Sequence, residues 1–495
     1  MMEDDDLIRA HPQPTTPKTL ENGSSSSIKS RLAAIFRPYK WSFIGFLILA
    51  SLIPKVYDLT NTFWIGHISY EALAITEQYE FLGVTIEIVN ETIPFGVLAL
   101  IAQNYRNKEK IISILKSGLV IQLFFSITLM SIVVLFIPQF VSTIGTPEEI
   151  VSLTQRYLLL RAVALPFDAV IVLLLISITC MRRGRDVLYL QIFSVAINIV
   201  LDLFLISNTS VSLRLGVEGV AISYVVSQIA TFFVISAFAI RILGIKRISF
   251  SFAKWNATAR SIFSIGGWTG LDSLVRNIGY IMVPLNVLNV IGANQYGGYE
   301  LAMTVMWTVI IPVLAITEGT NVVVGNFYGE GNHKDIKKVV MTSLVLVSII
   351  MAVIGVGGAF FWNSLSRFFN QNPLMVHYST ATFWWLIIPY FLFALDMVLR
   401  SVFYGTGKTR NIFYISAFLN FVLIIPFWVL AKLNIITASF DNTMALFVVV
   451  FAASLLLAGL LATRVLKRVS AEVTPREGAK PRQDSWVSPK TLAKT

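Results

Sequence analysis

Long apolar stretches bounded by polar residues recur along the whole chain. A helix needs about 20 mostly apolar residues to cross a bilayer, and twelve stretches of that kind follow one another here with short polar connections. They predict an all-α polytopic membrane protein with twelve transmembrane helices. The predicted spans are 41–66, 72–101, 112–137, 153–180, 187–206, 217–243, 261–290, 298–325, 339–362, 380–404, 412–432 and 443–464.

Lys and Arg fall almost entirely in alternate connections between these spans. The tails and every second connection hold 31 of the 39 Lys and Arg residues, whereas the opposite connections hold only Arg156, Arg214, Arg367 and Lys432. Because Lys and Arg stay on the cytoplasmic side of a membrane, we predict that both termini are cytoplasmic. This distribution explains the net charge of +11 without nucleic acid as a partner, and a hydrophobic content of 55% excludes an ordinary soluble domain.

The second half of the chain repeats landmarks of the first. Pro166 and Gly184 have counterparts in Pro389 and Gly407, each 223 residues later. Six spans separate equivalent elements, so both halves have the same orientation, as in transporters whose parallel repeats flank a central cleft. Chance similarity among apolar helices is the alternative. The predicted domains are a disordered cytoplasmic tail (1–40), an N-terminal six-helix lobe (41–243), a cytoplasmic linker (244–260), a C-terminal six-helix lobe (261–465) and a second disordered tail (466–495).

Four motifs lie in order on this frame, at residues 57–66, 198–206, 215–221 and 324–332. Together they resemble the multidrug and toxic compound extrusion (MATE) family of exporters, over about residues 40–465. The resemblance implies a V-shaped pair of six-helix bundles related by a parallel pseudo-two-fold axis. It also implies a secondary antiporter that exports amphipathic, often cationic compounds such as drugs, toxins or metabolites in exchange for H⁺ or Na⁺ by alternating access.

Asn198 and Asp202 are the first candidates for an ion or proton site. Four residues apart, they share one helix face, and a carboxylate beside an amide offers oxygen ligands for Na⁺ or a place for a proton. In MATE proteins with an ion site in the N-terminal lobe, the matching Asn and Asp belong to it, so the resemblance implies such a site here. A polar clamp between helices is the alternative. The second lobe has Asn420 but Ile424 where the acid would be, so we predict ion coupling in the N-terminal lobe.

Asp58 and Asn61 on the first span complete the predicted ion or proton site. The family pattern places Asn first and Asp three residues later, whereas this chain reverses the order. The acid moves by about one turn along the same face, which keeps a carboxylate near Asp202 but changes the coordination geometry. The alternative is an ion pair with Lys55, one turn earlier, which would make Asp58 structural.

The second span carries a stripe of four glutamates, Glu77, Glu80, Glu87 and Glu91. Carboxylates on a membrane helix face protein or water, because each costs a few kcal/mol at mid-bilayer. We predict that Glu80, Glu87 and Glu91, together with Glu318 of the eighth span, line a central cleft that binds a cationic substrate or relays protons. The alternative is a network of ion pairs that neutralises these glutamates.

Two basic residues inside the spans, Arg161 and Arg276, are the candidates for neutralising the glutamates in such a network. Helical spacing also places three acid–base pairs on common faces: Arg161 with Asp168, Asp272 with Arg276, and Asp396 with Arg400. Arg276 falls about where many bacterial MATE relatives carry a glutamate implicated in ion coupling, which argues against an ion site in the second lobe.

No signature of an enzyme, an ATP-driven pump or a metal site is present in the sequence. The glycines of residues 325–331 lack the Gly-Lys-Ser/Thr ending of a phosphate loop, and the four His residues are scattered. We therefore predict no cofactor beyond the coupling ion. The predicted partners are a small organic substrate and membrane lipid, for a monomer in a bacterial-type inner membrane. The lone Cys180 excludes an intramolecular disulfide, and Asn208 begins a glycosylation sequon of a length that often occurs by chance.

Two other classes of membrane protein share parts of this pattern. A lipid-linked oligosaccharide flippase of the related polysaccharide-exporter type has the same two-lobed plan, but it needs a basic cleft for pyrophosphate, whereas this chain offers mostly glutamates. A channel or receptor is the third class, and the unequal lobes and the missing pore-loop motif argue against it. The sequence does not distinguish H⁺ from Na⁺ as the coupling ion.

Overall fold

The computed structural model describes residues 41–471 apart from 69, 145, 147, 208, 245–251, 289–290 and 370–371, and the regular structure in this part is helical. The first lobe consists of α2 (Trp41–Ile68), α3 (Tyr70–Gln103), α4 (Lys108–Ile144), α5 (Glu148–Cys180), α6 (Gly184–Leu205) and α7 (Gly216–Leu243). The second lobe consists of α8 (Phe252–Tyr280), η1 (Ile281–Leu288), α10 (Ala293–Val309), α11 (Ile311–Gly329), α12 (His333–Phe369), α13 (Pro373–Thr406), α14 (Arg410–Phe418), η2 (Leu419–Ile424), α15 (Ile425–Lys432) and α16 (Phe440–Ala471). The predicted tail 1–40 and the sequon residue Asn208 lie outside the described residues.

The described helices form twelve segments long enough to cross a bilayer. Ten segments are each long and apolar enough on their own, with α14, η2 and α15 counted as one, and α10 with α11 forms an eleventh that bends by 50°. The twelfth is α8 with η1, whose apolar character is interrupted by Asp272 and Arg276. The all-α architecture predicted from the sequence is confirmed.

Two predicted boundaries need correction. α8 begins at Phe252, inside the predicted linker 244–260, and α16 continues to Ala471, past the predicted boundary at 465. The apolar stretch marks only the part of a helix that lies in lipid, and nothing stops the helix at the membrane surface. Arg468 in the last turn of α16 also interacts favourably with the helix dipole.

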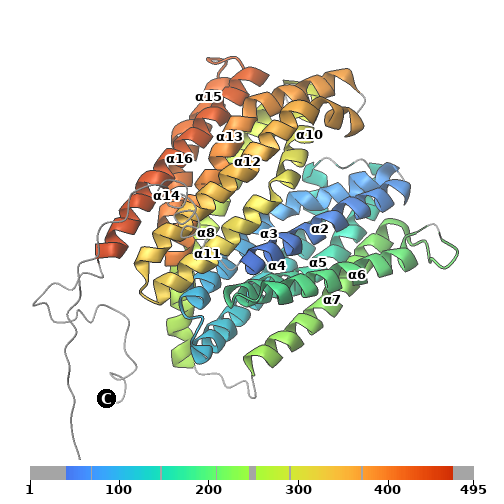
Figure 1. The fold of residues 1–495 in the computed structure, drawn as a ribbon. Coiled ribbons are helices and arrows are strands. Elements are labelled where there is room, and N and C mark those ends of the chain that lie inside the picture. Colours follow the sequence, from blue (N-terminus) through green and yellow to red (C-terminus); the bar gives the residue numbers. More distant parts are fainter. Residues whose placement is uncertain are drawn as a thin grey trace, which may run out of the picture.

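The two lobes lie side by side and meet along α3, α8 and α11 (Figure 1). α3 of the first lobe packs on α8 and α11 of the second lobe, and α11 also packs on α2. Away from this contact, toward the right of the view, the lobes diverge (Figure 1). The end where they meet carries the connections 104–107, 181–183, 330–332 and 407–409, and we call it the basic end because the Lys and Arg residues gather there.

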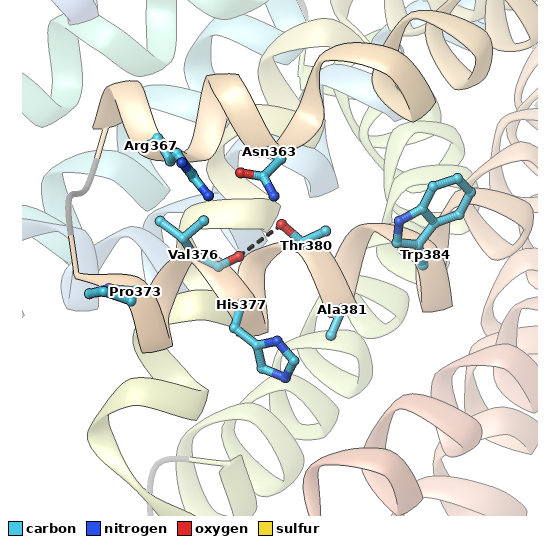
Figure 2. Close-up of a pocket in the computed structure, with 8 residues that line it drawn as sticks. All are labelled: Asn363, Arg367, Pro373, Val376, His377, Thr380, Ala381 and Trp384. Atoms are coloured by element: carbon cyan, nitrogen blue, oxygen red, sulfur yellow. Dashed lines mark hydrogen bonds between the residues drawn. The ribbon is translucent and has the colours of Figure 1, made fainter.

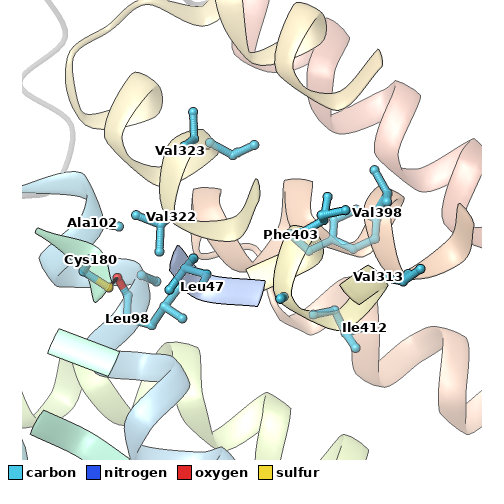
Figure 3. Packing of buried hydrophobic residues seen from close by; sticks show 14 of the residues in the cluster. Leu47, Leu98, Ala102, Cys180, Val313, Val322, Val323, Val398, Phe403 and Ile412 are labelled. Atoms are coloured by element: carbon cyan, nitrogen blue, oxygen red, sulfur yellow. Dashed lines mark hydrogen bonds between the residues drawn. The ribbon is translucent and has the colours of Figure 1, made fainter. Parts of the chain in front are cut away.

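One cluster of buried apolar side chains runs through both lobes. Figure 3 shows part of it, where Leu98 and Cys180 of the first lobe lie near Val322 of the second lobe. A separate apolar cluster is built only from helices of the first lobe, around Leu158. The continuous core therefore crosses from one lobe to the other.

Hydrogen bonds between the lobes close the basic end. Arg182 Nε donates to Asn326 Oδ1 at 2.5 Å, and Asn326 Nδ2 donates to the Ala102 carbonyl oxygen at 2.8 Å. Gln103 Nε2 donates to the Gly405 carbonyl oxygen at 3.0 Å. Positions 182 and 405 differ by the repeat offset of 223, so the two lobes contribute equivalent segments to this contact. The conformation is one in which the lobes are joined at the basic end.

Glycine permits a very close approach of α3 and α8. A Cβ atom at Gly266 would lie 1.8 Å from the Thr92 carbonyl oxygen, and one at Gly270 would lie 2.0 Å from Thr92 Oγ1. One at Gly96 would lie 2.5 Å from the Ile262 carbonyl oxygen. Because no side chain fits at these distances, the contact between the lobes depends on these glycines.

We predict that Gly266→Ala lowers the apparent melting temperature of the detergent-solubilised protein, because overpacking a tight contact costs about 1–3 kcal/mol. Gly267→Ala is the matched control, since an added Cβ there meets nothing within 4 Å. Alanine favours a helix more than glycine does, so the control variant should melt no lower than the wild type. Equal melting temperatures for the two variants would contradict the close α3–α8 contact.

Candidate functional site

A cavity of about 480 Å³ lies mainly in the second lobe and reaches α3 and α5 of the first lobe. Clefts of about 300–1,000 Å³ hold drug-sized ligands in other proteins. Most of the wall is apolar, and its aromatic residues are Phe95, Tyr299, Phe393, Tyr404, Phe447 and Phe451. The size and the ring-rich lining suit a flat or amphipathic organic molecule.

Arg400 and Asp396 form a buried ion pair in the wall of this cavity. Arg400 Nε donates to Asp396 Oδ2 at 2.7 Å, and Ser454 Oγ donates to the same oxygen at 2.9 Å. Arg400 Nη1 also lies 4.0 Å from Asp272 Oδ1. The pair predicted from the spacing of Asp396 and Arg400 is confirmed, and Ser454, which bonds to both partners, links α13 to α16.

Arg276 on α8 joins the second lobe to two glutamates of α3. Its Nη2 atom lies 3.1 Å from Glu87 Oε1 and 2.9 Å from both carboxylate oxygens of Glu91. Its Nε atom lies 4.0 Å from Asp272 Oδ2, as the spacing of these two residues predicts. Asn277 Nδ2 donates to Glu87 Oε2 at 3.3 Å. For Glu87 and Glu91, the structure therefore agrees with the alternative in which Arg276 neutralises the glutamates.

Glu318 on α11 lines the same cavity as Glu91. Among the described residues it has no ion pair and no hydrogen-bond partner for its carboxylate. It shares the cavity with the guanidinium groups of Arg276 and Arg400, but these are bound to other acids. The side chain of Glu80 lies outside the described residues, so its predicted place in the cleft remains a prediction.

A second polar cluster lies inside the first lobe, around Asp202 on α6. Tyr57 on α2 donates to Asp202 Oδ2 at 3.0 Å, and Ser223 on α7 donates to Asp202 Oδ1. Ser223 Oγ also lies 3.3 Å from Asn198 Oδ1. Asp202 is 2% exposed and Asn198 is 5% exposed. The structure thus brings these two predicted residues together through Ser223, which, like Tyr57, the sequence analysis did not select.

Asp58 lies outside this buried cluster. It is about half exposed and forms an ion pair with Lys55 at 2.9 Å, as the alternative in the sequence analysis describes. Successive residues of a helix point about 100° apart, so Tyr57 reaches Asp202 while Asp58 points elsewhere. Asn61 lies one turn after Tyr57, and its buried Oδ1 atom has no hydrogen-bond partner among the residues that the structure describes. The prediction of Asp58 as a ligand beside Asp202 is corrected, whereas Asn61 stays a candidate.

The pair predicted from the spacing of Arg161 and Asp168 is present as an electrostatic interaction, but not as a direct ion pair. Arg161 lies over the rings of Tyr79, at 4.2 Å, and Tyr224, at 3.5 Å, and it has no ion pair with Asp168 among the described contacts. The Tyr224 hydroxyl donates to Asp168 Oδ2 at 3.0 Å instead. The ring of Tyr224 on α7 therefore contacts Arg161 where the spacing predicted the Asp168 carboxylate.

A wider surface cavity of about 670 Å³ lies where α12 ends and α13 begins (Figure 2). Arg367 and Asn363 come from α12, and His377 and Trp384 come from α13. Its described lining holds a guanidinium and an imidazole and no carboxylate. It is therefore less suited to a cation than the cavity beside Glu318.

Comparison with known proteins identifies the family of this chain. The MatE family model matches residues 47–204 and again residues 269–430, more than half of the chain. The chain belongs to the MATE family. The two matched stretches also correspond to the internal repeat read from the sequence, and the recognition of this family from four motifs is confirmed.

Two curated relatives of this MATE protein are both named probable multidrug resistance protein NorM. The protein from Thermotoga maritima is 21% identical over 370 residues, covering 72% of this chain and 78% of the relative. The protein from Photorhabdus laumondii is 24% identical over 428 residues, covering 82% and 92%.

Solved structures support the same fold. An outward-facing multidrug resistance MATE transporter of the MOP superfamily superposes with a TM-score of 0.77 at 17% identity, covering 86% of this chain and 95% of that chain. A MOP superfamily transporter from Pyrococcus furiosus, described as having a binding pocket of reverse polarity, superposes with a TM-score of 0.75 at 16% identity, covering 87% and 95%. The predicted twelve-helix, two-bundle fold is confirmed.

We predict that Arg400→Leu destabilises this MATE protein by about 3–5 kcal/mol, because it leaves the buried Asp396 carboxylate without its partner. The double variant Asp396→Leu/Arg400→Leu should recover most of that loss, since it removes both charges. Thermal unfolding of the purified proteins in detergent measures both. A double variant no more stable than Arg400→Leu would contradict a mainly pairwise role.

Proposed function

We propose that this MATE protein is a secondary antiporter that exports amphipathic cationic organic compounds in exchange for H⁺ or Na⁺. The observation that carries the proposal is the aromatic-lined cavity of about 480 Å³ with Glu318 in its wall. The Glu318 carboxylate has no ion pair or hydrogen bond within the part of the chain that the structure describes. Aromatic faces attract cations, and a carboxylate without a built-in partner needs an external cation or proton. The relatives named as multidrug resistance proteins favour a small organic cargo.

In this proposal the coupling ion binds in the first lobe, beside Asp202. Tyr57 and Ser223 hydrogen-bond that carboxylate, and Ser223 Oγ also lies 3.3 Å from Asn198 Oδ1. Asn61, one turn after Tyr57 on α2, adds a buried amide oxygen that has no hydrogen-bond partner among the described residues. Oxygen ligands of this kind suit Na⁺, and a buried carboxylate equally suits a proton. Binding of the ion favours one arrangement of the lobes, and binding of the cargo beside Glu318 favours the other. Each ligand drives the change only by its difference in affinity for the two states.

The basic end faces the cytoplasm in this proposal, because Lys and Arg gather on that side of membrane proteins. The conformation joined through Arg182 and Asn326 is then closed toward the cytoplasm. Both termini would be cytoplasmic, and the protein would act as a monomer in a bacterial-type inner membrane. Transport by lobe rearrangement requires no cofactor beyond the coupling ion.

A lipid-linked oligosaccharide flippase is the less favoured alternative. Such a protein binds pyrophosphate, which needs an excess of basic groups. The cavity instead has Glu91, Glu318 and Asp396 against Arg276 and Arg400, and Asp272 and Glu87 contact the same two guanidinium groups. This balance favours a cation.

We predict that Asp202→Asn abolishes ion-driven efflux while the protein still reaches the membrane, because the amide holds neither a proton nor a full negative charge. Efflux of a cationic dye from proteoliposomes with an imposed pH or Na⁺ gradient measures this. Asp58→Asn is the control, since that exposed acid lies outside the Asp202 cluster. Undiminished transport by Asp202→Asn would reject the ion site.

We predict that Glu318→Gln weakens the binding of tetraphenylphosphonium by about tenfold, the size expected for losing one favourable charge interaction in a partly shielded site. Binding of the neutral triphenylphosphine oxide should not change. Titration calorimetry on the purified protein compares the two ligands. An equal loss for both would indicate damage to the cavity rather than loss of a charge contact.

A further inference from the structure

Arg276 lies where the second lobe, the first lobe and the cavity meet. α8 supplies its guanidinium to the cavity wall, and α3 supplies the two glutamates that it binds. The side chains of Arg276 and Glu87 are 46% and 44% exposed, and that of Glu91 is 18% exposed. Ion pairs this open in a membrane protein face water rather than lipid, so a dissolved cation can reach them.

The acids around Arg276 outnumber it. Glu87, Glu91 and Asp272 all lie within 4.0 Å of its guanidinium, so one positive charge is shared among three carboxylates. Arg400, which is also 4.0 Å from Asp272, is bound to Asp396. Glu91 lines the same cavity as Glu318, whereas Glu87 and Asp272 are linked to that cavity through the arginines of its wall.

A cation that enters this cavity therefore meets a built-in competitor. A guanidinium group makes directed hydrogen bonds to carboxylates, and here it already holds both oxygens of Glu91. A bound organic cation either displaces Arg276 from Glu91 or contacts only the Glu318 carboxylate. In both cases the tethered charge of Arg276 weakens the affinity of the cavity for external cations.

We propose that Arg276 is a specificity-determining residue, a tethered cation that competes with the cationic cargo for the acids of the cavity. This inference rests on the proposed function and adds the reason why cargo is released. By lowering the affinity for cations, Arg276 lets the cavity return its cargo to water. It also limits binding to compounds whose charge and aromatic surface together bind the cavity more strongly than Arg276 binds Glu91.

The test measures the transport of radiolabelled tetraphenylphosphonium by the full-length protein in proteoliposomes. Arg276→Gln should lower KM by about tenfold, because the acids lose their internal partner. It should also lower kcat, because release becomes slow. Arg276→Lys keeps the charge and should stay within about threefold of the wild type in both constants, a threshold well below the one-charge effect. Inhibition by neutral triphenylphosphine oxide should be the same for all three proteins.

An unchanged or raised KM for Arg276→Gln would overturn the inference, and so would an equal shift for the neutral inhibitor. If Arg276→Gln does not fold, Glu87→Gln/Glu91→Gln provides the converse test. It leaves the guanidinium without its glutamates, so KM for tetraphenylphosphonium should rise by about tenfold, and an unchanged KM would overturn the inference. If wild-type protein transports no organic cation at all, the proposed function fails together with this inference. If wild type transports it and only the Arg276 results fail, the proposed function stands.

Discussion

The structure depends on how charged side chains are accommodated within a bundle of membrane helices. A charge that faces lipid is expensive, and a buried charge without a partner destabilises the fold. Arg400 meets this constraint for Asp396, and Arg276 does so for Glu87 and Glu91. Glu318 lies on the cavity wall without such a partner among the described contacts. The distribution of guanidinium groups thus decides which acids hold the protein together and which acid can take a ligand.

The two lobes share a repeat but differ in chemistry. The first lobe has Asn198 and Asp202, and the second lobe has Asn420 and Ile424 at the matching positions. Asp202 of the first lobe accepts hydrogen bonds from the hydroxyl groups of Tyr57 and Ser223, whereas the buried acids of the second lobe pair with arginines. The second lobe carries most of the aromatic-lined cavity and both of its arginines, Arg276 and Arg400. This difference underlies the proposed division between an ion site in one lobe and a cargo site in the other.

Much of the fold follows from the sequence, because each membrane helix must show a long apolar stretch. The repeat was visible because equivalent Pro and Gly residues punctuate both halves at one offset. The pairs four residues apart, such as Asp396 and Arg400, were predictable because one helix brings both partners together. Element boundaries were less predictable, since a helix continues beyond the lipid, as α16 does to Ala471.

Contacts between distant segments could not be predicted in the same way. Helical periodicity places Asp202 on a face but does not say that Tyr57 and Ser223 lie opposite it. The seven-residue spacing of Arg161 and Asp168 suggested a direct pair, because nothing in α5 indicates that a tyrosine from α7 contacts both. Glu91 and Glu318 line one cavity although they lie on helices of different lobes. Such sites depend on the packing of whole helices.

The most direct test of the account is the position of a bound cation. A crystal structure with tetraphenylarsonium would locate the positive centre through the anomalous scattering of arsenic. The account predicts a peak inside the second-lobe cavity, within about 6 Å of the Glu318 carboxylate and of an aromatic ring of the wall. A peak beside Asp202 in the first lobe, or an empty second-lobe cavity with the cation bound elsewhere, would contradict it.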